Sequence, residues 1–304
     1  MRYLFGPVPS RRLGLSLGVD LIPPKTCSYD CLYCQIGKTT CKALEPSTYV
    51  PVEAVVAELD ETLAKAKPDY VTFSGSGEPT LHAELGRIIA YVKGKAGVKV
   101  AVLTNGSLLY RPEVRERLLK ADIVMPTLST VKEETFRLIH RPHDDLNVSG
   151  VIEGLKSFRK SYRGQLFIEV MLLAGINDRD EEIEALRRVI LEIAADRVQL
   201  NTVVRPPADA KAIPLDRTRL EHIKRVFGEC AEIIATTPIR DKQTFSGTLS
   251  DAVLEMAKRR PVTVEEVAGV LSAPLFEVDK AVKDLVQKGE LREQPHLGKD
   301  YYTA

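Results

Sequence analysis

The sequence lacks an excess of charge of either sign, a long apolar run and a large set of cysteines. Its 304 residues carry 43 Lys and Arg against 42 Asp and Glu, a formal net charge of +1, so no general basic field attracts nucleic acid or an anionic membrane. No stretch reaches the roughly 18 apolar residues of a transmembrane helix, and residues 1–14 lack the apolar core of a signal peptide. We therefore expect a cytoplasmic protein with no membrane partner.

Cysteine is scarce, and the five cysteines are unevenly placed. An odd number in a chain without a leader does not suit a disulfide framework. Three of them, Cys27, Cys31 and Cys34, are separated by three and then two residues. One loop with this spacing wraps three thiolates around a single inorganic centre, and thiolates favour iron-sulfur clusters or zinc. Zinc needs four ligands, and Cys41 would then be the fourth.

Short β-rich segments alternate with helical periodicity from residue 14 to about residue 235, which is the pattern of a parallel α/β sheet or barrel. Apolar side chains recur at helical spacing between these segments, for example at Val52, Val55 and Leu59. Six segments are apolar enough to be strands buried on both faces. They are residues 16–22, 70–73, 98–103, 122–125, 166–173 and 198–203.

The pattern changes after the polar stretch 236–247, which is typical of a linker. Thr263 is the expected N-cap of a helix in the following region, with Glu266 three residues on. Three helices followed by two short strands are typical of a winged-helix domain. We expect a barrel domain over residues 1–241 and a winged-helix domain over residues 246–304. The expected elements of the second domain are helices 250–260, 262–271 and 274–287 and strands 290–294 and 299–303.

Three further features are expected to be structural. Segment 140–145, His-Arg-Pro-His-Asp-Asp, is typical of a helix end rich in turn residues rather than of a metal site. Cys230 continues an apolar helix face that starts at Leu220, and we expect it to be a core thiol. Beside an iron-sulfur cluster, Cys41 would be an unliganded loop cysteine.

The Cys-x3-Cys-x2-Cys spacing, with the aromatic Tyr33 before the last cysteine, resembles the signature of the radical S-adenosylmethionine (SAM) superfamily. The resemblance implies that Cys27, Cys31 and Cys34 bind three irons of a [4Fe-4S] cluster, and that SAM chelates the fourth iron through its amino and carboxylate groups. It also implies reductive cleavage of SAM to methionine and a 5′-deoxyadenosyl radical that abstracts a hydrogen atom. Such chemistry needs exclusion of water and oxygen, so we expect an anaerobic or microaerobic setting and an electron donor of the flavodoxin or ferredoxin class.

Small and polar residues recur where successive predicted strands end, and parallel α/β barrels build their active sites there. The strand 70–73 is followed by a glycine-rich turn with a carboxylate, a feature that lets backbone approach a ligand closely. By resemblance this turn holds the SAM amino group, although Ser76 stands where the family often has a glycine, and later strand ends contact the rest of SAM. The SAM contacts that the resemblance implies are Tyr33, Gly75, Ser76, Gly77, Glu78, Pro79, Thr104, Asn105, Gly106, Ser129, Ile176 and Asn177.

Polar side chains in or beside apolar strands are candidates for substrate contact. Glu169 lies in an apolar strand, where a carboxylate is costly unless it faces the interior and finds a partner, either in the site or in a structural Arg or Lys. Asn201 and Arg205 lie on or just after the sixth strand, and an arginine suits a phosphate or a carboxylate. Arg11 and Arg12 precede the first strand, and they either reach an anionic substrate or are solvated.

The resemblance covers about residues 3 to 235. Its closest form is a poorly characterised radical SAM group that shares the start Phe-Gly-Pro-Val-Pro-Ser-Arg-Arg-Leu-Gly, residues 5–14 here, and is often classed with wyosine-type tRNA-modifying enzymes. Those enzymes carry additional N-terminal cysteines, whereas this chain has none before Cys27. The substrate class therefore stays open among RNA or another nucleotide, a peptide or protein, and a small metabolite.

The alternative is an iron-sulfur-sensing regulator that binds DNA through the winged helix and has no catalysis. Residues 246–304 carry eight Lys and Arg against ten Asp and Glu, whereas a helix that reads a DNA groove is basic. A sensor also has no need of the SAM contacts at Glu78 and 104–106. We therefore predict an α/β enzyme, a partial (β/α)6 TIM-like barrel of the radical SAM type, whose winged helix docks a protein or peptide, dimerises or covers the barrel mouth.

Overall fold

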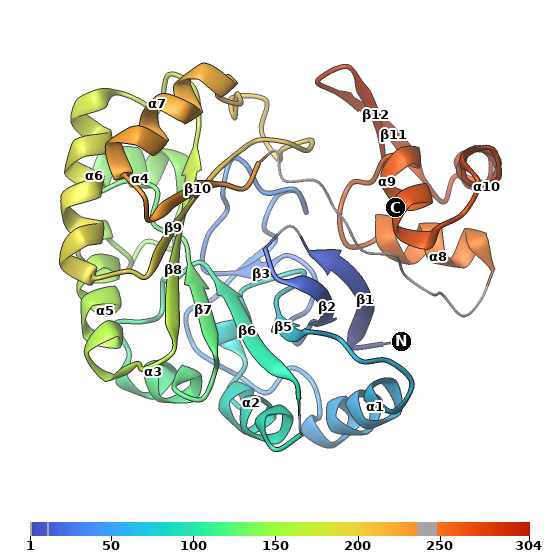
Figure 1. Ribbon diagram of the computed structural model, residues 1–304, viewed down its shortest axis with the longest axis horizontal. Coiled ribbons are helices and arrows are strands. Elements are labelled where there is room, and N and C mark those ends of the chain that lie inside the picture. The colour runs from blue at the N-terminus through green and yellow to red at the C-terminus, as the bar shows by residue number, and fades with distance from the viewer. Residues whose placement is uncertain (1, 11, 96, 236–247) are drawn as a thin grey trace.

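The computed structural model describes residues 2–10, 12–95, 97–235 and 248–304 (Figure 1). Arg11 and the predicted linker, 236–247, lie outside the described residues. The described chain forms a sheet unit, residues 2–235, and a C-terminal unit, residues 248–304. Within these ranges no helix has the length and apolar character needed to span a bilayer.

One eight-stranded sheet builds the sheet unit, with the strand order β1-β2-β5-β6-β7-β8-β9-β10. Neighbouring strands are parallel from β2 to β10, and β1 is antiparallel to β2. The six predicted strands are confirmed as β2 and β5 to β9, which also confirms the α/β class. The bounds are β1 Leu4–Ser10, β2 Gly14–Val19, β5 Tyr70–Phe73, β6 Lys99–Thr104, β7 Ile123–Pro126, β8 Gln165–Leu172, β9 Arg197–Thr202 and β10 Ala231–Ile233. A separate small sheet pairs β3 (Thr26–Cys27) with β4 (Cys41–Lys42).

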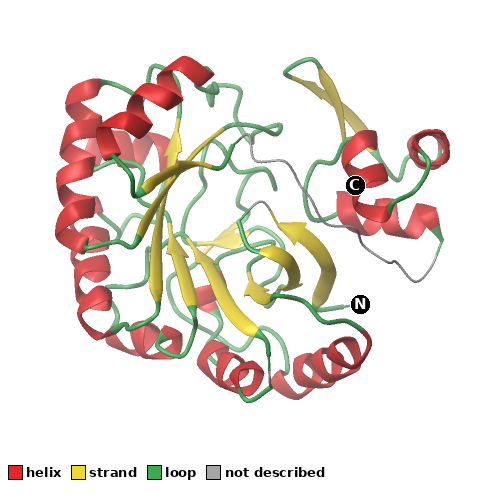
Figure 2. Ribbon diagram, in the orientation of Figure 1, coloured by secondary structure: helices red, strands yellow, loops and turns green. Residues whose placement is uncertain are grey.

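Helices follow most strands and cover the outer side of the curved sheet (Figure 2). Their periodic apolar residues face the strands, and Val55, Leu59 and Ile88 are fully buried. Because each helix returns the chain to the same edge, the carboxyl ends of the parallel strands gather on one side of the unit. The helices are α1 Val52–Lys65, α2 Leu85–Lys93, α3 Pro112–Leu118, α4 Glu133–His140, α5 Val148–Ser161, α6 Asp180–Ile193 and α7 Arg217–Phe227, with a 3-10 turn at Pro79–Leu81.

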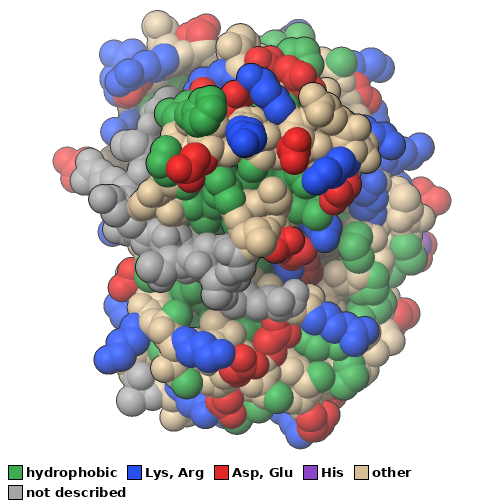
Figure 3. All heavy atoms as spheres, turned by 90° about the vertical axis from the view of Figure 1, so that its right-hand side faces the viewer, with side chains coloured by type: hydrophobic (Ala, Val, Ile, Leu, Met, Phe, Trp, Pro, Cys, Tyr) green, Lys and Arg blue, Asp and Glu red, His purple; other side chains and the backbone are tan. Residues whose placement is uncertain are grey.

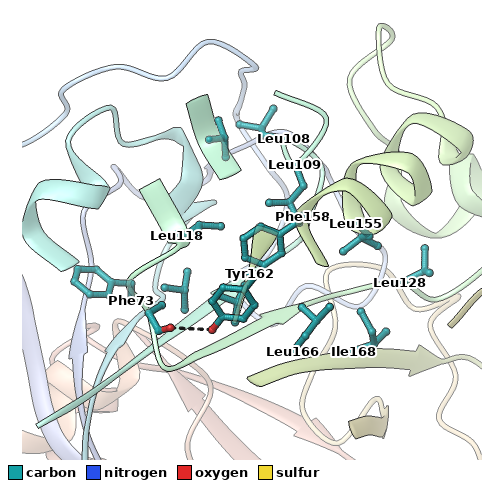
Figure 4. Packing of buried hydrophobic residues seen from close by; sticks show 14 of the residues in the cluster. Phe73, Leu108, Leu109, Leu118, Leu128, Leu155, Phe158, Tyr162, Leu166 and Ile168 are labelled. Atoms are coloured by element: carbon teal, nitrogen blue, oxygen red, sulfur yellow. Dashed lines mark hydrogen bonds between the residues drawn. The ribbon is translucent and has the colours of Figure 1, made fainter. Parts of the chain in front are cut away.

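The apolar layer between helices and sheet is continuous, and α5 shows how it is held (Figure 4). Phe158 stacks on Tyr162 with ring centroids 4.6 Å apart. The Tyr162 hydroxyl donates a hydrogen bond of 3.0 Å to the Ala121 carbonyl, so this buried polar atom is satisfied. Leu166 and Ile168 of β8 pack in the same cluster. Each such side chain contributes roughly 1.5–3 kcal/mol of burial free energy, which fixes the strand ends that follow.

Two sequence expectations need correction at the edges of the sheet. Strand β1 was not expected, because Gly6 and Pro7 are poor strand residues, yet the edge position tolerates them. The expectation that Cys230 is a core thiol is wrong, since Cys230 is exposed. Helix α7 ends at Phe227 because Gly228 takes a φ of 82°, and the chain then leaves the helical face before β10.

The C-terminal unit has its own apolar cluster, which includes Val253, Val267 and Val282. Thr263 caps the second helix as expected and accepts a hydrogen bond of 3.2 Å from the Glu266 backbone N–H. Its elements are α8 Leu249–Ala257, α9 Val264–Leu271 and α10 Leu275–Gln287, with the antiparallel pair β11 Arg292–His296 and β12 Lys299–Thr303. This is the expected element order, and the winged-helix assignment stays a prediction. Basic and acidic side chains are interspersed on the face shown in Figure 3.

Side-chain contacts join the two units. Arg259 pairs with Asp20 at 3.4 Å, donates to the Leu4 carbonyl at 3.2 Å and lies over the Phe5 ring at 4.6 Å. The Tyr301 hydroxyl donates to the Val204 carbonyl at 2.8 Å, and Arg205 forms an ion pair with Glu266. These contacts hold the C-terminal unit beside β1 and the end of β9.

Candidate functional site

A cavity of about 570 Å³ lies where the strand ends face the C-terminal unit, a size that suits a small-molecule ligand. Both units line it, so it has two walls. The sheet wall includes Cys27, Cys31, Tyr33, Cys34, residues 74–79, Thr104, Asn105, Thr127 and Glu169. The C-terminal wall consists of Ala252, Glu255, Met256, Arg259, Arg260 and Leu271.

The cysteine loop follows β3 and is fixed by backbone hydrogen bonds. The Asp30 and Leu32 N–H groups donate to the carbonyls of His140 and Ile139, each at 2.9 Å, so the end of α4 supports the loop. Inside the loop, the Asp30 carboxylate accepts a hydrogen bond of 2.7 Å from the Thr39 N–H. These contacts hold the three half-buried thiols on one side of the cavity.

The environment of the thiols keeps them protonated when no metal is bound. Burial, with the nearby Glu78 carboxylate, raises the pKa of Cys27 to about 12. Burial and the two neighbouring cysteines raise the pKa of Cys31 well above its usual range. The Asn105 amide N–H donates to Cys27 Sγ at 3.4 Å, which favours the thiolate once its proton is lost.

The glycine-rich segment 74–79 packs against the start of the cysteine loop. The Glu78 N–H donates to the Thr26 carbonyl at 3.2 Å, and the Ser76 carbonyl accepts from the Lys25 N–H at 2.7 Å. A Cβ on Gly77 would lie 2.1 Å from the Thr26 carbonyl oxygen, so only glycine fits there. Ser76, the departure from the family pattern, donates its hydroxyl to Asp20 at 2.7 Å.

The Glu78 side chain is buried and joins two strand-end segments. Its Oε1 accepts hydrogen bonds from the Thr80 hydroxyl at 2.6 Å, the Thr80 N–H at 3.0 Å and the Thr104 hydroxyl at 2.5 Å. Its Oε2 accepts one from the Asn105 N–H at 2.7 Å. Burial nevertheless raises the pKa of Glu78 above its usual value, and no ion pair compensates this burial among the described residues.

Glu169 lines the cavity as well and, unlike Glu78, it has a cationic partner. Arg12 forms an ion pair with Glu169 Oε1, the Asn201 amide donates to the same atom at 2.9 Å, and the Thr127 hydroxyl donates to Oε2 at 3.3 Å. Burial opposes ionisation of this carboxyl, but Arg12 and these hydrogen bonds outweigh it and lower the pKa of Glu169. The structure thus brings Arg12, Glu169 and Asn201 together.

Four of the sequence-predicted SAM contacts do not line the described part of the cavity. The Asn177 amide donates to the carbonyls of Ser129 and Met171, each at 2.9 Å, and the Ser129 hydroxyl accepts from the Met171 N–H at 3.1 Å. Ile176 packs in an apolar cluster that also includes Tyr33. Gly106 turns the chain with a φ of 75°. These residues support the strand ends behind the cavity surface.

Arg205 has a different contact from the one expected. Its side chain is only 6% exposed and pairs with Glu266, while its Nε donates to the Pro261 carbonyl at 3.2 Å. Arg205 is absent from the cavity lining. Arg205 therefore attaches the C-terminal unit to the sheet unit, because its guanidinium is engaged by Glu266.

Two parts of the site were missed by sequence reasoning. His140 is buried with its Nδ1 3.3 Å from Cys31 Sγ and 3.4 Å from the Tyr33 hydroxyl, and burial lowers its pKa to about 3, so it is neutral. It lies 109 residues from Cys31, and no spacing links the two. The residues of the C-terminal wall were not predicted either, since α8 carries no motif that marks it as part of a site; covering of the barrel mouth was one of the alternatives expected for this region.

The sequence of this chain is similar to those of known proteins. Residues 21–187 match the family model described as the radical SAM superfamily. The chain is 38% identical to a protein named GTPase Obg from Brachyspira hyodysenteriae, over 96% of this chain and 43% of that protein, so it spans less than half of that relative. It is 33% identical to UPF0026 protein MJ1312 from Methanocaldococcus jannaschii, over 99% of this chain and 96% of that protein.

The fold is similar to that of solved radical SAM proteins. A radical SAM methyltransferase from Sphaerobacter thermophilus superposes with a TM-score of 0.56 at 16% identity, over 74% of this chain and 67% of that chain. At this identity the likeness concerns the fold alone. It agrees with the mixed α/β architecture and its parallel sheet.

Proposed function

The chain belongs to the radical SAM superfamily, whose enzymes use a [4Fe-4S] cluster and SAM, and on that premise we propose that its cavity holds both cofactors. Cys27, Cys31 and Cys34 are the proposed cluster ligands. The observation that carries the proposal is convergence: the three thiols, segment 74–79 and the Thr104–Asn105 turn, up to 78 residues apart in sequence, line one cavity.

The donor set fits a cluster better than a single zinc ion. Among the described residues, no three His, Cys, Asp or Glu side chains are arranged to hold one metal ion. Three thiolates that each bind a different iron of a cluster are spread around a larger body. Cys41, the fourth ligand that zinc would need, is exposed and is absent from the lining of the cavity. Because burial raises the pKa of Cys27 to about 12, cluster binding releases protons and is favoured by higher pH.

When bound, the two cofactors supply reductive cleavage of SAM to methionine and a 5′-deoxyadenosyl radical that abstracts hydrogen from a substrate. The residues of the chain bind, orient and shield. Glu78 Oε1 accepts three hydrogen bonds, whereas Oε2 accepts one, so Oε2 has a lone pair for an ammonium donor such as the SAM amino group. Asn105 donates to Cys27 Sγ, and the neutral His140 packs behind Cys31.

The setting of the reaction follows from the needs of the cofactors. Radical SAM enzymes require a reductant, and we propose a donor of the flavodoxin or ferredoxin class. The chemistry of these cofactors needs exclusion of water and oxygen, and the three proposed ligand thiols are only half-buried, so we propose a cytoplasmic, oxygen-poor environment.

The C-terminal unit has a role at the cavity in this proposal. We infer that residues 1–241 form the radical SAM partial-barrel domain and that residues 246–304 form a winged-helix domain that covers the barrel mouth. The lining residues on α8 support the covering role, and the acidic balance of this region disfavours DNA. The substrate class stays open among a nucleotide or RNA, a peptide or protein, and a metabolite.

The proposal is tested by a SAM-cleavage assay. The protein is reconstituted with iron and sulfide under strict anoxia and then mixed with dithionite and SAM. We expect 5′-deoxyadenosine, detected by liquid chromatography and mass spectrometry, together with the visible absorbance of a cluster. Cys34→Ala should lose both signals, because two thiols do not replace three ligands.

The matched control is Cys41→Ala, which removes an exposed thiol seven positions from Cys34 and should keep both signals. Equal iron content in the two variants would show that the ligand assignment is wrong. Absence of product from a cluster-loaded protein that binds a promoter tightly would instead favour the sensor.

A further inference from the structure

The C-terminal wall places an arginine at the cavity whose charge is poorly neutralised. Arg260 follows α8 and lines the cavity with its side chain 23% exposed. Its one carboxylate neighbour among the described ion pairs is Glu266, whose Oε1 lies 3.6 Å from Arg260 Nη1. That separation is too long for a hydrogen bond. The guanidinium donors of Arg260 are therefore not engaged by this carboxylate.

Glu266 is already engaged by another arginine. The same Oε1 atom is in hydrogen-bond contact with Arg205 Nη2, and Arg205 itself is 6% exposed. Among the described residues, two guanidinium groups thus share this one carboxylate, which leaves one positive charge uncompensated by it. Burial, and then the charge of Arg205, lower the pKa of Arg260 to about 10. Arg260 is still charged at neutral pH, and an added anion would relieve the repulsion.

The other charged groups of the cavity are accounted for differently. Glu169 pairs with Arg12, Glu255 with Lys258 and Arg259 with Asp20, so each of these has a partner of opposite charge. Glu78 accepts four hydrogen bonds on the sheet wall. Lys25 is exposed to solvent and lies beside Cys34. Only Arg260, among the described lining residues, combines partial burial with a carboxylate that a second arginine already uses. Apolar Met256 and Leu271 line the same wall and reduce the competition from water.

We propose that Arg260 binds an anionic group of the substrate, a phosphate or a carboxylate, at the C-terminal wall of the cavity. This inference rests on the proposed function, because it names the substrate chemistry of the same site. A guanidinium is planar and suits bidentate contact with either anion. In the proposed function the carboxylate of SAM chelates the cluster. The anion at Arg260 is therefore a group of the substrate.

The test measures anion binding by the full chain, without cluster or SAM. Inorganic phosphate and, in a separate arm, succinate are titrated by calorimetry at constant ionic strength. We expect one of the two to bind, and Arg260→Gln to weaken that binding roughly tenfold or more, as expected for loss of a charge-assisted hydrogen bond. Glu266→Gln should tighten it, because the competing carboxylate is removed. Binding of phosphate alone would identify a phosphate-bearing substrate, and binding of succinate alone would identify a carboxylate.

The control variant is Lys258→Gln, which removes an equal positive charge two residues from Arg260. The Lys258 side chain is 52% exposed. The anion affinity of this variant should equal that of the wild type. Circular dichroism checks that each variant folds, and Arg260→Lys, which keeps the charge and loses the planar fork, should be intermediate. The proposal is overturned if neither anion binds, or if wild type and Arg260→Gln bind equally. Because no cofactor is present, the SAM-cleavage assay can fail or succeed independently of this result.

Discussion

The two walls of the cavity are built in opposite ways. The sheet wall consists of strand-end segments that hydrogen-bond to one another through buried groups, with Glu78 accepting four hydrogen bonds. The C-terminal wall combines apolar side chains with two arginines and Glu255, and side chains such as Arg205 and Arg259 attach it to the sheet unit. A preorganised wall suits fixed cofactors, whereas a separately folded wall with few attachments suits the part that selects the substrate.

Asp20 is shared by the two walls. Asp20 accepts hydrogen bonds from the Ser76 hydroxyl at 2.7 Å and the Ser76 N–H at 3.1 Å, and it also pairs with Arg259 at 3.4 Å. The glycine-rich segment of the sheet wall and the end of α8 therefore share one carboxylate. Displacement of the C-terminal unit would remove a cation from the group that orients Ser76.

The largest effect should come from the sheet wall. Glu78→Ala leaves the Asn105 N–H and the donors of Thr80 and Thr104 without their shared acceptor, at about 1–3 kcal/mol for each buried donor left unpaired. We expect the free energy of unfolding to fall by about 3 kcal/mol or more, measured by urea denaturation. Glu255→Ala, a half-exposed carboxylate on the C-terminal wall, should change it by less than about 0.5 kcal/mol. Equal losses in both variants would contradict the contrast between the walls.

A smaller effect should appear at the attachment of the C-terminal wall. Arg205→Met removes the partner of Glu266, and Arg260 at 3.6 Å can replace it in part. We expect a loss of about 2 kcal/mol, less than for a fully buried pair with no substitute. Hydrogen exchange should accelerate in α9 while β6 and β7 of the sheet wall keep their protection. Unchanged exchange in α9 would show that this ion pair does not hold the unit.

The third prediction concerns acid stability of the sheet wall. Arg12 and the hydrogen bonds outweigh burial and lower the pKa of Glu169, so its ionised form stabilises the fold. This contribution is complete above the ordinary glutamate pKa of about 4.3 and is lost as the pH falls through the lower, folded pKa. Glu169→Gln should cost about 1.5 kcal/mol near neutral pH, and its difference from wild type should shrink on acidification. Urea unfolding at several pH values measures this, and a constant difference would contradict the pairing.

The smallest effect is expected outside both walls. Cys41 and Cys230 are exposed, and Cys230 Sγ makes a weak 3.4 Å contact with the Phe227 carbonyl. The double variant Cys41→Ser and Cys230→Ser should change the free energy of unfolding by less than about 0.5 kcal/mol. Iron bound per chain after reconstitution should be unchanged, and a loss of iron would add one of these thiols to the ligands.

Much of the sheet unit could be predicted from the sequence, because its strands are continuous apolar runs and its helices have a clear 3.6-residue period. The elements at the edges of the sheet were not predicted correctly. Strand β1 contains Gly6 and Pro7, which local propensity assigns to a turn, and its strand conformation depends on pairing with β2. Cys230 was assigned to a helix because Gly228, which ends α7, does not interrupt the apolar period.

The sequence by itself determined the features that short stretches of chain encode: the α/β alternation, the thiol spacing at Cys27, Cys31 and Cys34, and the small polar strand ends. Only the tertiary structure decided which side chains meet. Arg12 reaches Glu169 across 157 positions, His140 reaches Cys31 across 109, and Arg205 reaches Glu266 across 61. The physical reason is that ion pairing and burial depend on distance through space, and no periodicity or spacing along the chain records that distance.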